Sequence, residues 1–512
     1  MKFLKAAAAA LAAVVMISLC ACDNGADISS DSTDMSGSSG ISSEAFSTEG
    51  SETGEGSSVS EVSSEPVNEE PQPSAVALQY AEKAEELREL YGEISKEKDF
   101  PAINITTLDN EAILSKERYV ESVVDVFNYG DGGEIVSAEG GVKVRGNSTA
   151  NDDEKPYRIK FNEKQSMLGL HNGRAYKSWV LLRSFWNLAP DYMGFNLAKE
   201  IFEGKYYSSD CAYVNLYVNG VSRGLYLLCE QNQAASGRVD VTEPAGDEAP
   251  DEIGYLLEMD NYPDENDHPF FTVVHGKKEF TDITGKTRTF VDKCYSIRSD
   301  TTTREQRDFI EKYIKNVYMI LFMAADGRLY MLDEKYDLVS AEGVYNTPKE
   351  AVEAVIDTES LACYLILEEL VQNYDVGEGS FYMAVDFGKD SIYPRLTFLA
   401  PWDFNWGYSE DPSGGYYACT FQKLAEGNDR SNTWFITAMK QEWFRDIVKE
   451  KWQSLGERKA INQAVKYVLD STAVLENDLG EEGWKTEKAA EICAYVLRRK
   501  RWLDGEWGVD AQ

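Results

Sequence analysis

Two aspartates lie among aromatic residues at positions where strands are expected to begin or end. Asp403 lies within APWDFNWGY, residues 400–408, directly after a predicted strand, and Asp375 lies within QNYDVGEGSFYM, residues 372–383, between a predicted helix and a strand. Acids at the mouths of neighbouring strands can converge on one point. Their oxygens would suit Mg2+, or one acid would bind the metal while the other orients a nucleophile. The alternative is that each aspartate caps a turn or accepts hydrogen bonds from buried backbone amides.

Basic residues gather in the segment 140–161, which is predicted to form two alternating strands around a polar loop. Arg145, Lys155, Arg158 and Lys160 lie here in a chain that is otherwise strongly acidic. Arg158 and Lys160 are two apart and therefore point to the same face of a strand. A cationic strip that faces two acids would suit a nucleotide phosphate with magnesium. The alternative is a set of solvated side chains at a strand edge.

Hydrolytic chemistry based on zinc or on a Ser-His-Asp triad is poorly supported. The three histidines, His171, His268 and His275, show no metal-ligand spacing, and no GxSxG motif accompanies them. The cysteines after Cys22 have wide spacing without a CxxC pair, which argues against a structural zinc site. Disulfides and buried free thiols both stay open for these six: Cys211, Cys229, Cys294, Cys363, Cys419 and Cys493.

The N-terminal half is predicted to be mainly β-structure. A charged helix is expected at about 76–98, and a further helix at about 190–202 is inserted among strands. The clearest local pattern is the segment 212–231, in which apolar residues alternate on both sides of Asn219-Gly220. Those two residues favour the tight turn of a β-hairpin.

The C-terminal half changes to a helical period. Segments that begin at 307, 358 and 434 carry apolar residues at intervals of three and four, and Asp357 or Thr358 can cap the second helix. The fold class predicted from both halves is α+β with two lobes, the first β-rich and the second helical. A cleft between two lobes is a common place for a ligand.

The N-terminus has the pattern of an export signal. Lys2 and Lys5 precede an apolar stretch that ends in SLCAC, residues 18–22. LCAC resembles a bacterial lipoprotein signal, which would make Cys22 the lipidated first residue of the mature protein, anchored outside the cytoplasm. An ordinary secretory signal cleaved nearby is the alternative. The apolar run is too short for a permanent membrane span.

The next segment is predicted to be a disordered acidic tether, because it is rich in Ser, Gly, Glu and Asp and has few apolar residues to bury. The organisation predicted for the whole chain is a signal and lipidation site at 1–22, a linker at 23–75, a charged helix at 76–99, a main domain at 100–460 and a helical extension at 461–512.

Composition restricts the partners. The chain has 512 residues, of which 51 are Lys or Arg and 88 are Asp or Glu, so its formal net charge is 51 − 88 = −37. This balance disfavours nucleic acid and anionic lipid surfaces, so that a lipid anchor would be the one link to a membrane. It favours a basic protein partner.

The motifs together resemble the CotH family, which is named for a spore-coat protein. The series VRGNST, KPYRIKF, SWVLL, VNLYVNG, GLYLLCEQ, GYLLEMD, NYD with SFYM, and PWDFNWGY occurs in the order of that family and spans roughly 100–460. Members are regarded as atypical protein kinases with a reduced kinase-like fold. The spore-coat member phosphorylates serines in basic coat proteins. The resemblance therefore implies ATP and Mg2+, or Mn2+, as cofactors.

The resemblance also implies roles for single residues. Asp403 would bind the metal, and Asp375 would be the second essential acid, acting as a base or as a metal ligand. Asn405, at a position where a second Asp is common, would be the remaining metal-site residue. Lys160 resembles the phosphate-pairing lysine, with Glu230 as its charge partner or as a hinge residue. The residues implied at the ATP phosphates are Arg145, Gly146, Asn147, Ser148, Arg158 and Lys160.

Some positions depart from the family pattern. Besides Asn405, Ser380 stands where some members have Asn, and Gly194-Phe195 stands where an Arg-Asn pair is common. The leading hypothesis is an exported kinase that transfers the γ-phosphoryl group of ATP to Ser or Thr of a basic secreted or surface protein. The first alternative is a catalytically weakened surface scaffold that binds glycan or protein. The second is a glycosidase that uses a carboxylate pair.

Overall fold

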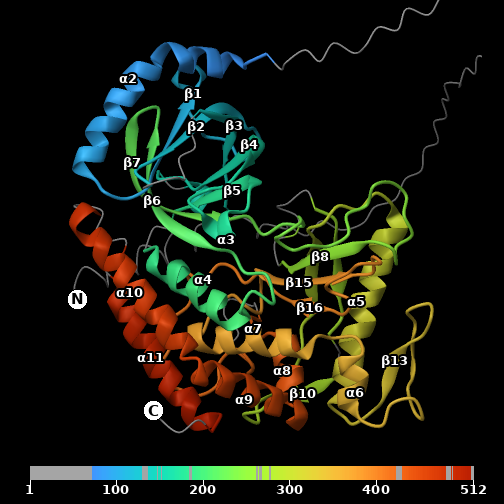
Figure 1. Ribbon diagram of the computed structural model, residues 1–512. Helices are drawn as coiled ribbons and strands as arrows, with labels where there is room; N and C mark the ends of the chain where they lie inside the picture. Colours follow the sequence, from blue (N-terminus) through green and yellow to red (C-terminus); the bar gives the residue numbers. More distant parts are fainter. Residues whose placement is uncertain are drawn as a thin grey trace, which may run out of the picture. The chain divides into compact units, whose positions relative to one another are not determined.

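The fold was established from a computed structural model of the chain (Figure 1). The structure describes residues 72–129, 137–146, 148–151, 153–183, 187–260, 263, 268–275, 278–422, 429–479, 486 and 488–508. Cys22 and Asn147 lie outside the described residues, as do the signal and nearly all of the linker, and the side chain of Ser148 is not described.

A closed barrel of seven strands forms the first part of the described chain, in the order β1-β2-β3-β4-β5-β7-β6. Neighbouring strands are antiparallel except for β1 and β6, whose parallel pairing closes the barrel. The strands are β1 (Ala102–Thr107), β2 (Val120–Phe127), β3 (Ala138–Val144), β4 (Tyr157–Gln165), β5 (Tyr176–Leu182), β6 (Cys211–Val218) and β7 (Val221–Glu230).

Strand β4 shows why the barrel has two different faces. Tyr157, Ile159 and Phe161 are buried in the barrel core, while Arg158 is half-buried and Lys160 is exposed. Alternation along the strand therefore places the two cations on the outer face. The prediction that they share a face is confirmed.

The predicted hairpin is also confirmed. Strands β6 and β7 flank Asn219 and Gly220, whose φ angles are 53° and 75°. Two consecutive positive φ values are those of a type I′ turn, which matches the twist of an antiparallel pair.

Helix α2 (Ala75–Glu97) is the helix predicted at about 76–98, and it packs on β1 and β2 (Figure 1). Ser74 caps its first turn. Tyr80 and Tyr91 each donate a hydrogen bond to the buried carboxylate of Asp125 in β2. The helix is therefore tied to the barrel by polar contacts as well as by its apolar face.

A second sheet has the order β16-β15-β8-β12-β9, and two pairs, β10-β11 and β13-β14, stand apart from it. Strands β15 and β16 come from the C-terminal half, so that half is not purely helical. The strands are β8 (Gly254–Met259), β9 (Phe270–Val273), β10 (Glu279–Thr281), β11 (Thr287–Thr289), β12 (Lys293–Ile297), β13 (Tyr330–Leu332), β14 (Leu338–Ser340), β15 (Phe381–Asp386) and β16 (Thr397–Phe398).

The remaining elements are mostly helices of the C-terminal half. Asp357 caps α7 by accepting a hydrogen bond from the Ser360 amide at 3.1 Å, as one of the two predicted caps. The helices are α3 (Leu170–Gly173), α4 (Ala189–Phe202), α5 (Arg304–Ala324), α6 (Pro348–Glu353), α7 (Thr358–Val371), α8 (Thr433–Met439), α9 (Glu442–Glu457), α10 (Ala460–Leu479) and α11 (Ala489–Glu506), with short 3-10 turns η1 (Leu108–Asn110) and η2 (Ser148–Asn151).

Helix α4 joins the barrel to the helices. It packs against β6 of the barrel and against α7, α10 and α11 (Figure 1). Outward-facing barrel residues such as Val180 and Leu225 share one hydrophobic core with these helices, and the barrel interior forms a separate core. The mixed α+β class is thus confirmed, and the finer division into two kinase-like lobes stays a prediction. No helix of the described ranges is long and apolar enough to cross a membrane.

Candidate functional site

Asp403 follows β16 and lies half-buried in a left-handed backbone conformation with φ +63°. Such a conformation is uncommon for residues other than glycine and is kept when surrounding contacts fix it. Asn405 donates a hydrogen bond to Asp403 Oδ1 at 2.7 Å, and the Asn373 amide donates to the Asp403 carbonyl at 3.1 Å. The backbone and the carboxylate of Asp403 are therefore both held by neighbouring amides.

The structure brings Asp375 to the same place. Asn373 links the two acids, because its side-chain oxygen also accepts a hydrogen bond from the Asp375 amide at 3.2 Å. Arg430 donates a hydrogen bond to Asp375 Oδ1, and its Nε lies 2.6 Å from Glu378 Oε2. Its guanidinium also stacks on the Tyr374 ring at 3.7 Å. These contacts fix the loop on which Asp375 lies.

A third acid, Asp191, was missed by sequence reasoning. It lies in the first turn of α4, is 5% exposed, and accepts a hydrogen bond from the Phe404 amide at 2.9 Å. Gly194, noted above as a departure from the family pattern, has a role in the same contact. A Cβ at Gly194 would lie 2.1 Å from the Phe404 ring, so the helix can approach this ring because position 194 has no side chain.

Arg145, directly after β3, is the basic residue whose charge acts on Asp191 and Asp403. Its guanidinium lies 5.8 Å from the centre of the Trp402 ring. Burial raises the pKa of Asp403 above its usual value, and the charge of Arg145 opposes this. Burial, and then the charge of Asp403, raise the pKa of Asp191 to about 7, against the Phe404 amide and Arg145. One cation thus acts on two carboxylates.

Burial also raises the pKa of Asp375, to about 6. Arg430 lowers it, while the charges of Asp403 and Glu378 raise it further. The electrostatic coupling of Asp375 with Asp403 agrees with the hydrogen bonds through Asn373.

The other predicted basic residues lie on the outer face of the barrel. Arg158 pairs across the sheet with Lys143, and Lys160 pairs with Ser178 of β5. Gly146 has φ +91°, and a Cβ there would lie 2.3 Å from Thr149 Oγ1, so the turn after Arg145 requires glycine. The predicted phosphate roles of these residues stay predictions.

The predicted pairing of Glu230 with Lys160 is wrong. Glu230 is fully buried, with Oε1 at 3.3 Å from Arg238 Nε and Oε2 at 2.9 Å from His171 Nδ1. Its sheet partner is Trp179, which faces the barrel interior, whereas Lys160 points outward. The two side chains are therefore on opposite faces of the sheet, which strand spacing alone did not reveal.

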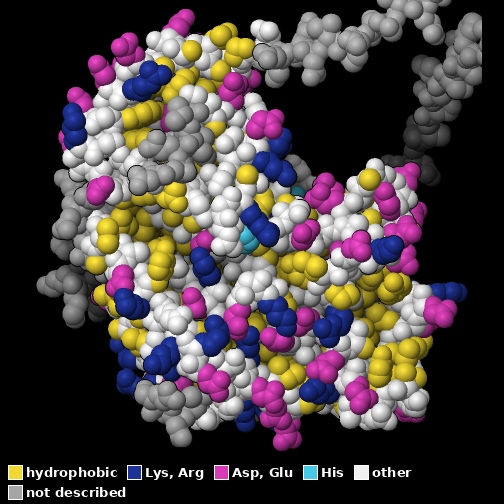
Figure 2. Space-filling model, viewed as in Figure 1, with side chains coloured by type: hydrophobic (Ala, Val, Ile, Leu, Met, Phe, Trp, Pro, Cys, Tyr) yellow, Lys and Arg dark blue, Asp and Glu magenta, His cyan; other side chains and the backbone are white. Residues whose placement is uncertain are grey.

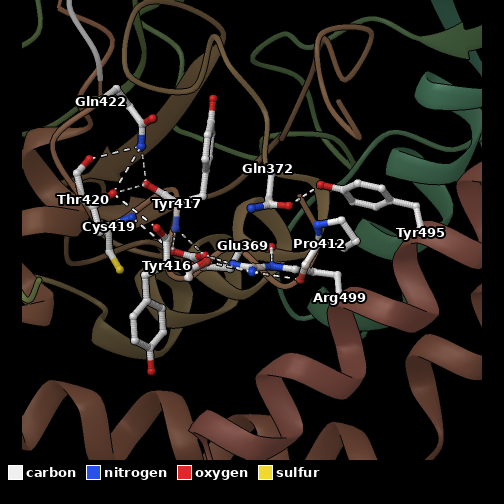
Figure 3. A network of polar contacts seen from close by, with 11 residues as sticks. Glu369, Gln372, Pro412, Tyr416, Tyr417, Cys419, Thr420, Gln422, Tyr495 and Arg499 are labelled. Atoms are coloured by element: carbon white, nitrogen blue, oxygen red, sulfur yellow. Dashed lines mark hydrogen bonds and ion pairs between the residues drawn. The ribbon is translucent and has the colours of Figure 1, made fainter. Parts of the chain in front are cut away.

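A buried ion pair holds the chain that follows Asp403 (Figure 3). Glu369 of α7 and Arg499 of α11 are both fully buried, and Arg499 Nη2 lies 2.6 Å from Glu369 Oε2. Glu369 also accepts hydrogen bonds from the amides of Tyr417 and Cys419, at 3.0 and 3.1 Å for the nearer oxygen. Arg499 donates to the Gly415 carbonyl at 2.8 Å. The signal that could have indicated this pair is the presence of two adjacent glutamates, Glu368 and Glu369, in a helix whose other residues near them are apolar.

The residues described above around Asp403 supply oxygen donors, and none of them is a cysteine or a histidine. Carboxylate and amide oxygens from Asp403, Asp375 and Asn405 are the hard ligands that Mg2+ or Mn2+ prefers. Within the described ranges no group of three or more His, Cys, Asp or Glu side chains is close enough to hold a metal ion by itself. The donor set therefore fits a magnesium ion that shares its coordination with phosphate oxygens and water.

The chain was also compared with curated proteins, solved structures and protein-family models. A search of curated proteins found no match. Among solved structures, the chain is similar to a chain in the complex of the Shewanella oneidensis MR-1 toxin–antitoxin system HipA, HipB and its operator DNA, with 11% sequence identity and a TM-score of 0.22. That match covers 65% of this chain and 61% of the other, and at this TM-score it supports no argument. The family model of the CotH kinase protein matches residues 142–503, which include Arg145, Asp191, Asp375 and Asp403. The chain belongs to the CotH kinase family.

Proposed function

We propose that this protein is a kinase that transfers the γ-phosphoryl group of ATP to Ser or Thr of a basic secreted or surface protein. The observation that supports this most directly is the cluster of Asp403, Asp375 and Asp191 beside Arg145, in a chain of the CotH kinase family. Phosphoryl transfer depends on positioning and on stabilising charge. Here hydrogen bonds tie Asp375 and Asp191 to the chain around Asp403, and the charge of Arg145 acts on Asp191 and Asp403.

Asp403 is the principal metal ligand in this proposal, with Asn405 as a further oxygen donor. Bound Mg2+ or Mn2+ would neutralise the charge of the ATP phosphates. Asn405 already donates to Asp403 Oδ1, which leaves Oδ2 as the oxygen available for a cation. The left-handed backbone at Asp403 and the Asn373 contact fix the direction in which that oxygen points.

Asp375 orients the substrate hydroxyl and accepts its proton. It is anchored by Arg430 and by the Asn373 side chain, so its carboxylate has a fixed position. A pKa of about 6 places it close to neutral pH, where a general base is most effective. Arg430 keeps this carboxylate ionised against the burial that opposes ionisation.

The phosphates would lie against the cations of the barrel. Arg145 is nearest to the acids, Gly146 turns the backbone sharply beside it, and Lys160 and Arg158 are on the same outer face. Guanidinium and ammonium groups are the usual partners of phosphate oxygens. An exposed Lys160 would thus remain available to the nucleotide.

The proposed substrate follows from charge. A net charge of −37 raises the association rate of a basic partner and lowers that of nucleic acid. Acidic side chains are spread over the face shown in Figure 2, among lysines and arginines, rather than gathered in one patch. We therefore expect the electric field of the whole protein, rather than of one acidic patch, to attract a basic partner. The proposed location is outside the cytoplasm, with Cys22 lipidated as the link to a membrane.

The test is isothermal titration of ATP into the purified chain with Mg2+, with Mn2+ and without metal. We expect micromolar binding that requires metal and disappears in Asp403→Ala, while the melting temperature stays nearly unchanged. Asp386→Ala is the matched control, because Asp386 is a buried acid in β15 that accepts backbone amides away from the site. Equal metal-dependent binding in Asp403→Ala would overturn the assignment. Absence of binding under any metal would favour the scaffold function.

A further inference from the structure

We propose that Asp191 is a positioning residue for this reaction, which holds Asp403 in place and adds a second buried negative charge that attracts the divalent cation. The inference rests on the proposed function and deepens it. It assigns a role to the first turn of α4, a segment that the catalytic motifs of the sequence did not include.

The first argument is the direct contact. Asp191 Oδ1 accepts the hydrogen bond of the Phe404 amide at 2.9 Å, and this amide belongs to the peptide unit that directly follows Asp403. Asp403 has φ +63°, a conformation that needs external support. A hydrogen bond to the next amide fixes the orientation of that peptide plane. Asp191 therefore acts on the direction of the Asp403 side chain through the backbone.

The second argument is packing around the contact. Gly194 admits the Phe404 ring, and Phe195 of the same helix meets the rings of Trp402 and Phe404 edge-on at 5.2 and 5.4 Å. The Tyr408 hydroxyl reaches the Pro190 carbonyl at 3.4 Å. The first two turns of α4 and the chain from 402 to 408 are thus joined at several points, so Asp191 cannot move independently of Asp403.

The third argument is the balance of charge. The charge of Asp403 acts on Asp191, and Arg145 is the cation that acts on both carboxylates. Two carboxylates and one guanidinium leave one negative charge uncompensated when both acids are ionised. Burying like charges together is unfavourable unless a cation joins them. A divalent ion beside Asp403 would supply that charge, and Asp191 would strengthen its binding without contacting the nucleotide.

The experiment measures Mn2+ binding to the purified chain by electron paramagnetic resonance, with and without ADP. Asp191→Asn keeps an oxygen for the Phe404 amide and removes the charge. We expect its Mn2+ affinity to fall on the order of tenfold with a melting temperature close to that of the unchanged protein. Asp386→Asn is the matched control, since Asp386 is 3% exposed and also accepts backbone amides, from Thr242 and Gly388. Its Mn2+ affinity should not change.

A reciprocal variant keeps the inference testable if Asp191→Asn fails to fold. Arg145→Gln removes the shared cation, so Mn2+ without nucleotide should bind severalfold more tightly. Unchanged or weaker Mn2+ binding in Arg145→Gln, or unchanged binding in a folded Asp191→Asn, overturns the role of Asp191. If the unchanged protein binds neither Mn2+ nor Mn2+ with ADP, the proposed function itself fails, and the two failures are thereby distinguished.

Discussion

Two groups of buried charges in this molecule differ in how they are compensated. Glu369 and Arg499 pair with each other, Arg499 Nε donates to the Glu369 carbonyl, and their other contacts are with backbone groups of the chain from 412 to 419. At Asp403, by contrast, two carboxylates share the charge of Arg145. A compensated pair holds a structure together, whereas an excess of one sign indicates where a ligand of the other sign binds.

The two groups are nevertheless connected through the chain. The segment that the Glu369–Arg499 pair fixes begins at Pro412, nine residues after Asp403 (412 − 403 = 9), and α7, which contains Glu369, ends just before the loop with Asp375. The pair therefore limits the motion of the chain segments that adjoin both acids. Its role in the reaction would be indirect, through the rigidity of the polypeptide around the site.

Loss of the compensated pair should cause the largest effect on stability. Arg499→Ala leaves Glu369 buried without its cation, so we expect the free energy of unfolding to fall by about 3–5 kcal/mol. The measurement is the midpoint of urea unfolding. Arg498→Ala is the control, because Arg498 precedes Arg499 on α11 and is exposed. Its replacement should lower the free energy of unfolding by less than about 0.5 kcal/mol. A loss below about 1 kcal/mol in Arg499→Ala would show that the pair is not what holds this segment.

Removal of one charge from the acids around Asp403 should lower the rate of phosphoryl transfer rather than the stability of the fold. Asp375→Asn retains an oxygen for Arg430 but cannot accept the substrate proton, so kcat should fall by about 10²–10⁴-fold. ATP affinity, measured by titration, should stay within about threefold, because the nucleotide is held by Asp403 and the barrel. A variant that loses ATP binding to the same extent as turnover would make Asp375 a metal ligand rather than a base.

The elements that sequence predicted well are those that depend on neighbouring residues. The β6–β7 hairpin follows from Asn219-Gly220, the cap of α7 follows from Asp357, and the outer face of β4 follows from alternation around Ile159. Each of these features is decided within a few residues of chain. The meeting of Asp375 and Asp403 was inferred from strand ends, and the Asn373 bridge is the contact by which it occurs.

The features that sequence missed depend on contacts between distant segments. Asp191 and Phe404 are 213 residues apart, and Glu369 and Arg499 are 130 apart. No local period identifies such partners, and in a chain with 88 acidic residues one more aspartate in a helix is inconspicuous. Glu230 was misassigned for the same reason, since its partner Arg238 lies beyond the strand in a loop whose path the pattern does not fix.

Lys293 is a third buried charge, and it belongs to neither of the two groups. Its ammonium is held by the carbonyls of Gly377 and Asp429, and burial lowers its pKa to about 8 from 10.5. The unfolded chain therefore binds more protons between pH 8 and pH 10.5, so this residue makes stability rise with pH in that window. The free energy of unfolding of the unmodified protein minus that of Lys293→Met should therefore increase by about 2 kcal/mol from pH 8 to pH 10. A difference that is independent of pH in urea unfolding would contradict the lowered pKa.

The exposed cation of β4 should show the smallest effect, and an effect on binding alone. Lys160 is exposed on the outer face of the barrel, so Lys160→Ala should leave the urea midpoint unchanged. If it meets the phosphates of ATP, its removal should weaken Mg2+-dependent ATP binding by about tenfold, as expected for one charge-assisted contact. Lys164→Ala is the matched control, because Lys164 is an exposed lysine of the same strand about 13 Å further along, beyond the reach of the same phosphates. Equal ATP affinity in the two variants would remove Lys160 from the site and leave Arg145 as the phosphate-binding residue of the barrel.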